Sequence, residues 1–222
     1  MENQYCYKYP RPALTTDQVI FGFGEGELRV LLIRRGNEPF KGKWALPGGF
    51  MDMDEDAETC ARRELEEETG LKVVNFEQLY AFSDVDRDPR YRVVSIAYYA
   101  LVRWEDCKVK AGDDADRAQW FPLSGIPQMA ADRLKLKARY RPIGIDLLPP
   151  EFKMADLRHL YESVLQCTLD RDNFRRKMVG TGLLVDAEQE NRAKNGRKVR
   201  YYRFDRVKYR YFTEKGFYLK WE

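Results

Sequence analysis

The sequence has few of the residues on which zinc sites and disulfide frameworks depend. It contains one histidine, His159, and four cysteines, none of them in a CxxC or similar ligand spacing. The cysteines are Cys6, Cys60, Cys107 and Cys167. This scatter excludes a zinc site and a disulfide scaffold, and it indicates free thiols in a reducing compartment. The lone histidine stands in a helical pattern, and we expect it to pack or to face solvent rather than to act in catalysis.

Long hydrophobic segments are also missing. The longest near-apolar run, from Val93 to Val102, is far shorter than the roughly 20 residues that a membrane helix needs. The opening residues MENQYCYKYPRP lack the apolar core of a signal peptide. We therefore predict a cytoplasmic protein that has no membrane partner.

The length and the charge distribution predict two modules. A chain of 222 residues is long for one domain and is able to bury a core in each of two. Residues 1–140 hold 21 Lys and Arg against 24 Asp and Glu, a net charge of −3. Residues 141–222 hold 18 against 12, a net charge of +6. The opposite charges indicate that the two halves face different partners.

Three glutamates, Glu64, Glu67 and Glu68, crowd the last turns of a helix that Gly70 should end. Side chains three and four residues apart share a helix face, so these carboxylates repel one another. The negative C-terminal end of the helix dipole adds to the cost. A divalent cation is the natural missing partner, because carboxylate oxygens suit Mg²⁺ or Mn²⁺.

The flanking residues turn this cluster into a signature. The chain reads GFMDMDEDAETCARRELEEETGL from Gly49, with Glu55, Arg63-Glu64-Leu65, Glu67-Glu68 and Gly70-Leu71 at the spacing of the Nudix box. Such a match arises by chance less than roughly once in 10⁸ trials. The sequence therefore resembles the Nudix hydrolase superfamily, and a solvated acidic helix face is the alternative interpretation.

The resemblance implies a Nudix pyrophosphohydrolase, which splits a nucleoside diphosphate linked to another group. It implies that Glu64, Glu67 and Glu68, with the Gly49 carbonyl, hold Mg²⁺ or Mn²⁺, which neutralises phosphate charge and lowers the pKa of bound water. Arg63 can pair with Glu67 one turn on and orient it. The general base stays open between Glu64 and the aspartates of the AGDDAD loop. These aspartates are Asp113, Asp114 and Asp116.

The order of strands and helices predicts a mixed sheet between helices. Residues 19–23 and 28–34 are typical of two strands joined by the turn GEGE. Asp52 or Asp54 can cap the helix that carries the glutamates. Further strands are expected near 77–82, 92–102 and 118–121, and a helix over 127–140. The predicted fold class is α+β, with a Nudix α/β/α sandwich over residues 1–140.

Substrate choice must come from outside the box. The stretch from Asp84 to Val102 resembles the corresponding segment of Nudix enzymes and sensors that handle ADP-ribose. Within it, Arg87, Arg90 and Arg92 offer donors for phosphate or ribose oxygens, and surface solvation is the alternative for each. Aromatic residues such as Phe50 can stack on adenine or pack in the core.

The second half of the chain carries a different pattern. Residues 141–150 begin with Arg141-Pro142 and end with Pro149-Pro150, a pattern typical of a linker or a docking strand. Residues 151–222 begin with two helices joined by a tight turn, and Asp170 can cap the second helix, which runs from Arg171 to Thr181. Two strands with Asn195-Gly196 at their turn follow as a wing. This order predicts a winged helix-turn-helix domain that binds DNA.

The predicted DNA contacts lie on the second helix and the wing. Nine basic residues stand against one acidic residue from Arg192 to Arg210, which suits phosphate contacts, and a solvated basic hairpin is the alternative. The predicted contact residues are Arg171, Asn173, Arg175, Arg176, Lys177, Arg197, Lys198 and Arg200.

The whole chain resembles the Nudix-related transcriptional regulators through PIGIDLLP, an F-x4-L-x2-LYE helix and DRDNFRRK, which follow the Nudix segment. The resemblance implies a homodimer that binds a double-stranded DNA operator and senses an ADP-ribose-like or sugar effector. The box is often degraded in that family but is complete here. We therefore predict a regulator that retains Mg²⁺-dependent pyrophosphohydrolase activity. The alternative is primarily an ADP-ribose pyrophosphatase with an accessory basic domain.

Overall fold

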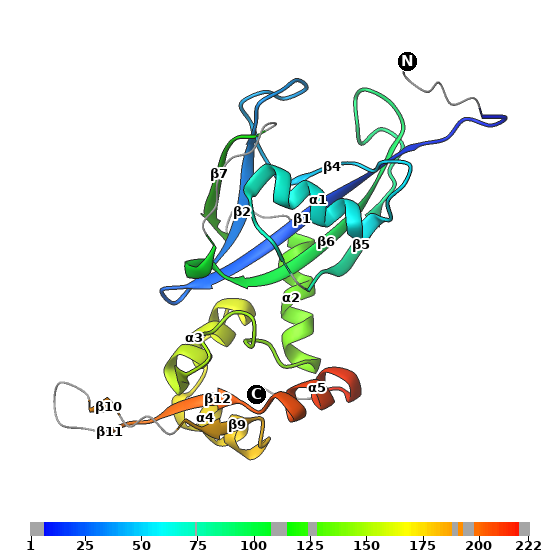
Figure 1. The fold of residues 1–222 in the computed structure, drawn as a ribbon. Helices are drawn as coiled ribbons and strands as arrows, with labels where there is room; N and C mark the ends of the chain where they lie inside the picture. The colour runs from blue at the N-terminus through cyan, green and yellow to red at the C-terminus, as the bar shows by residue number, and fades with distance from the viewer. Residues whose placement is uncertain are drawn as a thin grey trace. The chain divides into compact units, whose positions relative to one another are not determined.

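The computed structural model describes residues 7–73, 75–107, 115–123, 128–187, 191–192 and 198–217 (Figure 1). The chain packs as two compact units. The first comprises Met1–Val19, Leu31–Ala100 and Lys108–Gln119, and the second comprises Ile20–Val30, Leu101–Cys107 and Trp120–Glu222. These limits cut across strands, so they do not test the predicted domain boundaries at residues 140 and 150, which stay predictions.

Seven strands of the described residues form one sheet, in which β1 and β2 make an antiparallel hairpin. The strands are β1 (Ala13–Gly24), β2 (Glu27–Arg35), β3 (Trp44–Ala45), β4 (Gly48–Phe50), β5 (Glu77–Phe82), β6 (Val93–Arg103) and β7 (Ala115–Pro122). Their order is β3-β2-β1-β6-β5, with β4 paired to β1 and β7 paired to β2. The hairpin turns at Glu25 and Gly26, as the GEGE motif predicts, because both residues adopt left-handed backbone angles.

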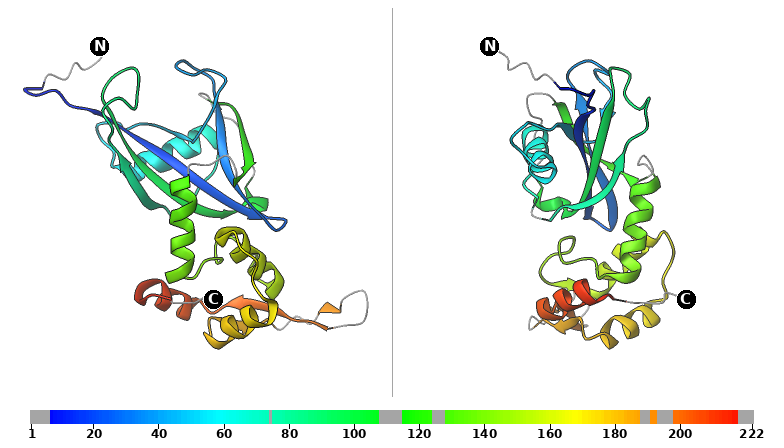
Figure 2. Two further views of the ribbon diagram at one scale, coloured as in Figure 1. Left: turned by 180° about the vertical axis from the view of Figure 1, so that it is seen from behind. Right: turned by 90° about the vertical axis from the view of Figure 1, so that its right-hand side faces the viewer.

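Helix α1 (Ala57–Thr69) lies along the sheet and packs against β4 (Figures 1 and 2). The predicted caps Asp52 and Asp54 were wrong, since Asp56 caps the helix and accepts a hydrogen bond from the Thr59 N–H at 2.8 Å. Only Asp56 directly precedes the first helical residue, and a capping side chain has to reach the N–H three residues on. Gly70 ends the helix in the left-handed conformation, as predicted.

The remaining elements all follow β6 in the chain, and those from β8 onward lie in its winged-helix part. They are η1 (Trp104–Asp106), α2 (Gln128–Tyr140), β8 (Phe152–Lys153), α3 (Met154–Leu165), α4 (Arg171–Gly180), β9 (Leu184–Asp186), β10 (Asn191–Arg192), β11 (Lys198–Val199), β12 (Tyr201–Phe204) and α5 (Arg206–Lys215). Strand β12 pairs with β8 on one side and β9 on the other. Strands β10 and β11 form a separate antiparallel hairpin where the wing was predicted. Helices α3 and α4 pack through buried residues that include Tyr161 and Phe174, whose rings meet edge to face.

The segment 141–150, predicted to be a linker or a docking strand, packs within the second unit. Ile143 is 1% exposed, and its N–H donates to the Tyr161 hydroxyl at 3.4 Å. The Tyr209 hydroxyl of α5 donates to the Pro142 carbonyl at 2.8 Å. These contacts make the segment part of a folded core, so its prolines mark a turn within the structure rather than a free tether.

Candidate ligand cavity and DNA-binding surface

A cavity of about 420 Å³ lies in the first unit beside the box. Its lining joins Gly49, Arg63, Glu64 and Glu68 of the box to side chains of β1, β2 and the loop before β6. This volume is in the range of small-molecule sites. The predicted catalytic cluster therefore borders a space that can take a ligand.

The helical spacing of α1 gives the three glutamates of the predicted metal site different exposures. The Glu64 side chain is 15% exposed and Glu68 is buried, and both line the cavity. The Glu67 side chain is 59% exposed and is not among the residues that line it. Glu68 accepts a hydrogen bond from the Gly48 N–H at 2.8 Å, which ties the end of α1 to β4.

Arg63 is the centre of an ion-pair network on α1. It contacts Glu55 at 2.6 Å, Glu64 at 2.8 Å and Glu67 at 3.1 Å. It also donates to the carbonyl oxygen of Phe50 at 3.1 Å. The predicted contact with Glu67 is present, but Glu55 is the closer partner. The hydrogen bond from Arg63 lowers the pKa of Glu55 to about 2, so Glu55 stays charged and holds Arg63 in place.

Glu64 lies against the glycine loop. A Cβ on Gly49 would lie 2.3 Å from the Glu64 carboxylate, so a side chain at this position would displace it. Desolvation by burial raises the pKa of Glu64, and Arg63 opposes that effect. The loop thus brings backbone and carboxylate together where only glycine fits.

The donor set fits a hard divalent ion by its chemistry, because Glu64 and Glu68 share the cavity with the backbone of Gly49. The side chains are nevertheless arranged around Arg63, which pairs with Glu64 and Glu67. Across the part of the chain that the structure describes, no group of three or more His, Cys, Asp or Glu side chains is placed to hold a metal ion. Glu67 would have to turn from Arg63 toward the cavity to supply a third carboxylate.

Two of the three arginines predicted to bind the substrate line the cavity. Arg87 stands 3.8 Å from Asp17, and Arg90 makes a two-pronged contact with Asp88 at 2.8 and 3.0 Å. The guanidinium of Arg90 also lies over the exposed Phe50 ring, 5.2 Å from its centroid. Arg92 is not part of the lining, and it donates to the carbonyl oxygen of Asp84 at 2.8 Å.

Sequence reasoning missed Asp17, which lines the cavity and accepts a hydrogen bond from Ser95. The available signal was that Asp17 is the one charged residue of strand β1. The alternative general bases Asp113 and Asp114 lie outside the described residues, and their proposed role stays a prediction.

The predicted DNA-reading helix is α4. Asp170 caps it as expected, accepting from the Asn173 N–H at 2.8 Å. Phe174 and Met178 are its buried residues, whereas Arg171, Arg175 and Arg176 are exposed. Asn173 and Lys177 are half-buried. Arg176 thus lies on the side of α4 away from Phe174 and Met178, whereas Arg171 is the first residue of the helix.

The contact residues predicted on the wing lie only partly within the described residues. Lys198 begins β11, and Arg197 lies outside the described residues. The Arg200 side chain is 62% exposed and stands 3.8 Å from Asp186. An exposed pair at this distance contributes little to stability, so Arg200 is available for a phosphate.

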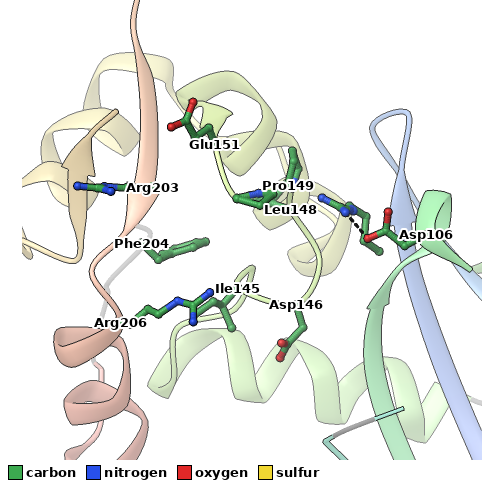
Figure 3. Close-up of a pocket in the computed structure, with 11 residues that line it drawn as sticks. Asp106, Ile145, Asp146, Leu148, Pro149, Glu151, Arg203, Phe204 and Arg206 are labelled. Carbon is green, nitrogen blue, oxygen red and sulfur yellow. Dashed lines mark hydrogen bonds and ion pairs between the residues drawn. The ribbon is translucent and has the colours of Figure 1, made fainter. Parts of the chain in front are cut away.

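A second cavity, of about 510 Å³, lies within the second unit (Figure 3). Its lining carries three arginines and three carboxylates, and the dashed contact in the figure joins Arg103 to Asp106. The balanced charges favour neither an anion nor a cation. The lining of the box cavity also mixes both signs of charge, and that cavity is the candidate ligand site because it holds glutamates of the box.

Comparison with known families agrees with this architecture. A family model of the NUDIX domain matches residues 14–141, and a model of the NrtR DNA-binding winged helix domain matches residues 144–204. The protein therefore belongs to the Nudix family, and the predicted α+β fold with a winged helix is confirmed.

Individual relatives show to which group within the Nudix family the chain belongs. The chain is 34% identical over 210 residues to the ADPR responsive transcriptional repressor NtrR of Acinetobacter baylyi, covering 88% of this chain and 83% of that protein. It is 42% identical over 132 residues to the ADP-ribose pyrophosphatase of Methanocaldococcus jannaschii, covering 60% and 75%. The crystal structure of Shewanella oneidensis NrtR complexed with a 27mer DNA matches with a TM-score of 0.75 and 30% identity, covering 89% and 95%. The chain belongs to the Nudix-related transcriptional regulators, as predicted.

No helix among the described residues is long and apolar enough to span a membrane. This finding agrees with the short apolar runs of the sequence.

Proposed function

We propose that this protein is a transcriptional regulator that binds a double-stranded DNA operator and responds to ADP-ribose or a closely related ligand. One chain contains both a cavity lined by Gly49, Arg63, Glu64 and Glu68 of the Nudix box and a winged helix with exposed arginines on α4, and this observation carries the proposal. The relative from Acinetobacter baylyi is named for its response to ADPR, and the similar Shewanella oneidensis structure contains DNA, which supports both parts.

The ligand belongs in the box cavity. Arg87 and Arg90 offer guanidinium donors to a pyrophosphate, because planar N–H pairs suit phosphate oxygens. Sugars without phosphate would use these donors less well, which favours a nucleoside diphosphate over a free sugar as the effector.

Retained hydrolase activity is the second part of the proposal. Nudix hydrolases generally use a divalent metal, and Glu64, Glu67 and Glu68 with the Gly49 carbonyl would hold Mg²⁺ or Mn²⁺ here. The bound ion would neutralise phosphate charge and lower the pKa of an attacking water. The chain itself contributes Arg63, whose contacts with Glu55 and the Phe50 carbonyl keep the glutamates beside the glycine loop.

The test combines operator binding with turnover. A labelled duplex from the region upstream of the protein's own gene is titrated by fluorescence anisotropy with and without ADP-ribose. A ligand shifts DNA affinity only by its differential affinity for the two states, and a change of roughly 5- to 150-fold is expected. Titrations that superimpose for every ligand that binds would refute the coupling.

Turnover is measured with ADP-ribose, NAD and sugar nucleotides in Mg²⁺ or Mn²⁺. Cleavage of ADP-ribose to AMP and ribose 5-phosphate is expected. If every nucleoside diphosphate stays intact, the protein acts as a sensor only. Turnover without operator affinity would instead favour the alternative of a pyrophosphatase, which the 42% identity to the Methanocaldococcus jannaschii enzyme supports.

A homodimer is part of the proposal, because helix-turn-helix proteins usually bind symmetric half-sites about 34 Å apart. Light scattering coupled to gel filtration should give twice the chain mass of 26.3 kDa. A monomeric mass for the operator-bound protein would contradict this.

A further inference from the structure

Asp17 lies where β1 borders the ligand cavity. Its strand neighbours Thr16 and Gln18 are fully buried, whereas the Asp17 side chain keeps 33% exposure and lines the cavity. The strand register places Asp17 opposite Gly48 of β4. A Cβ on Gly48 would lie 3.1 Å from Oδ1 of Asp17, so the glycine leaves this carboxylate uncovered beside the box.

The carboxylate is anchored on one oxygen. Ser95, fully buried on β6, donates its hydroxyl hydrogen bond to Oδ2 of Asp17. Arg87 stands 3.8 Å from the same oxygen, which is an ion pair but too long for a hydrogen bond. A carboxylate has about four acceptor positions, so these contacts leave Oδ1 able to accept from a ligand.

The pairing of Asp17 with Arg87 selects a particular chemistry. A carboxylate repels phosphate oxygens and accepts hydrogen bonds from hydroxyl groups, whereas a guanidinium donates to phosphate. Side by side, the two groups match a sugar that carries both free hydroxyls and a phosphate. Acidic side chains recognise ribose hydroxyls in this way in dinucleotide-binding folds, which shows that the chemistry is sufficient.

We propose that Asp17 accepts hydrogen bonds from ribose hydroxyls of the bound nucleoside diphosphate and thereby sets specificity for ribose over deoxyribose. The inference rests on the proposed function of the cavity and assigns it a residue that lies outside the Nudix box. Ser95 is the positioning residue, because it orients the carboxylate without reaching the ligand itself.

The experiment is a binding cycle on the full chain by isothermal titration calorimetry, with Mg²⁺ and separately with EDTA. The ligands are ADP-ribose and its two analogues that lack the 2′ hydroxyl of either ribose. Wild-type protein should bind one analogue about 10- to 100-fold more weakly, as expected for a hydrogen bond to a charged group. Asp17→Ala should bind ADP-ribose weakly and should no longer distinguish it from that analogue.

Three further variants separate this role from a structural one. Asp17→Asn keeps the shape of the side chain in case the alanine variant does not fold. Ser95→Ala should lose part of the discrimination while its thermal midpoint shows a folded protein. Asp86→Asn is the matched control, because Asp86 is exposed in the same loop as Arg87 and does not line the cavity, so it should behave as wild type.

The outcomes are distinct. Folded Asp17 variants that bind ADP-ribose with wild-type affinity, or that still discriminate as wild type does, would overturn the role of Asp17 alone. Wild-type protein that binds no ADP-ribose in either condition would overturn the proposed function together with this inference.

Discussion

The side-chain amine of Lys208 on α5 lies against Gly182, just beyond the C-terminal end of α4. Its Nζ is 2.6 Å from the position that a Cβ on Gly182 would occupy. Gly182 has a left-handed φ of 66°, and its N–H donates to the Val179 carbonyl at 3.0 Å. A cation near the last carbonyls of a helix is favourable, so Lys208 helps to hold the C-terminal end of α4, the helix predicted to read DNA.

Gly182→Ala should destabilise the protein by about 1–2 kcal/mol, because a Cβ disfavours the left-handed conformation, and it should also displace Lys208. If this displacement moves the end of α4, operator affinity should fall as well. Gly180→Ala is the matched control, since a Cβ there meets nothing within 4 Å and alanine favours a helix. Thermal unfolding measures the stability of both variants, and anisotropy titrations measure their operator affinity. Equal stability and equal affinity of the two variants would contradict the prediction.

Glu68→Gln should lower kcat for ADP-ribose by about 10² or more, since it removes a charge that holds the metal in the proposed mechanism. The amide oxygen can still accept from the Gly48 N–H, so folding should be preserved. Glu66→Gln serves as the control, because Glu66 is on the same helix but pairs with Lys72 at 2.8 Å. A steady-state assay at several Mg²⁺ concentrations measures both, and full activity of Glu68→Gln would exclude it as a metal ligand.

The ion pair between Asp88 and Arg90 should make the stability of the fold depend on pH in the acid range. Hydrogen bonds from Arg90 lower the pKa of Asp88 from 3.8 to about 2. The contribution of a carboxylate with a lowered pKa is complete above its ordinary pKa and is lost as the pH falls through about 2. The difference in thermal midpoint between wild type and Asp88→Asn should therefore shrink between pH 5 and pH 2. A difference that stays constant over this range would show that the ion pair does not stabilise the fold.

Arg176→Ala should weaken operator binding and reduce the salt slope by about 0.9, the value for one phosphate contact. Hydrolysis should be unchanged, since the residue lies on α4 and not at the box. Arg139→Ala on α2 removes the same charge from an exposed position outside the winged-helix motif and should leave the slope unchanged. Anisotropy titrations between 50 and 200 mM salt, the range over which phosphate contacts show their effect, give the slopes. Identical slopes for wild type and Arg176→Ala would place this residue outside the DNA interface.

Local interactions made much of this protein predictable from its sequence. The spacing from Gly49 to Gly70 identifies the box, and the period of an α-helix places Glu64 and Glu68 on one face. The end of α1 at Gly70 and the cap of α4 at Asp170 follow from backbone rules that involve only a few neighbouring residues. The order of strands and helices in the second half was sufficient to indicate a winged helix.

Contacts between distant residues were decided only by the tertiary structure. Ser95 reaches Asp17 across 78 positions of sequence, and the Gly48 N–H reaches Glu68 across 20. Such pairs depend on strand register and on the packing of α1, which no short pattern encodes. The burial of Ile143 in the segment predicted to be a linker has the same origin. Proline-rich sequence marks a turn, but whether that turn is covered depends on α3 and α5, which come from later parts of the chain.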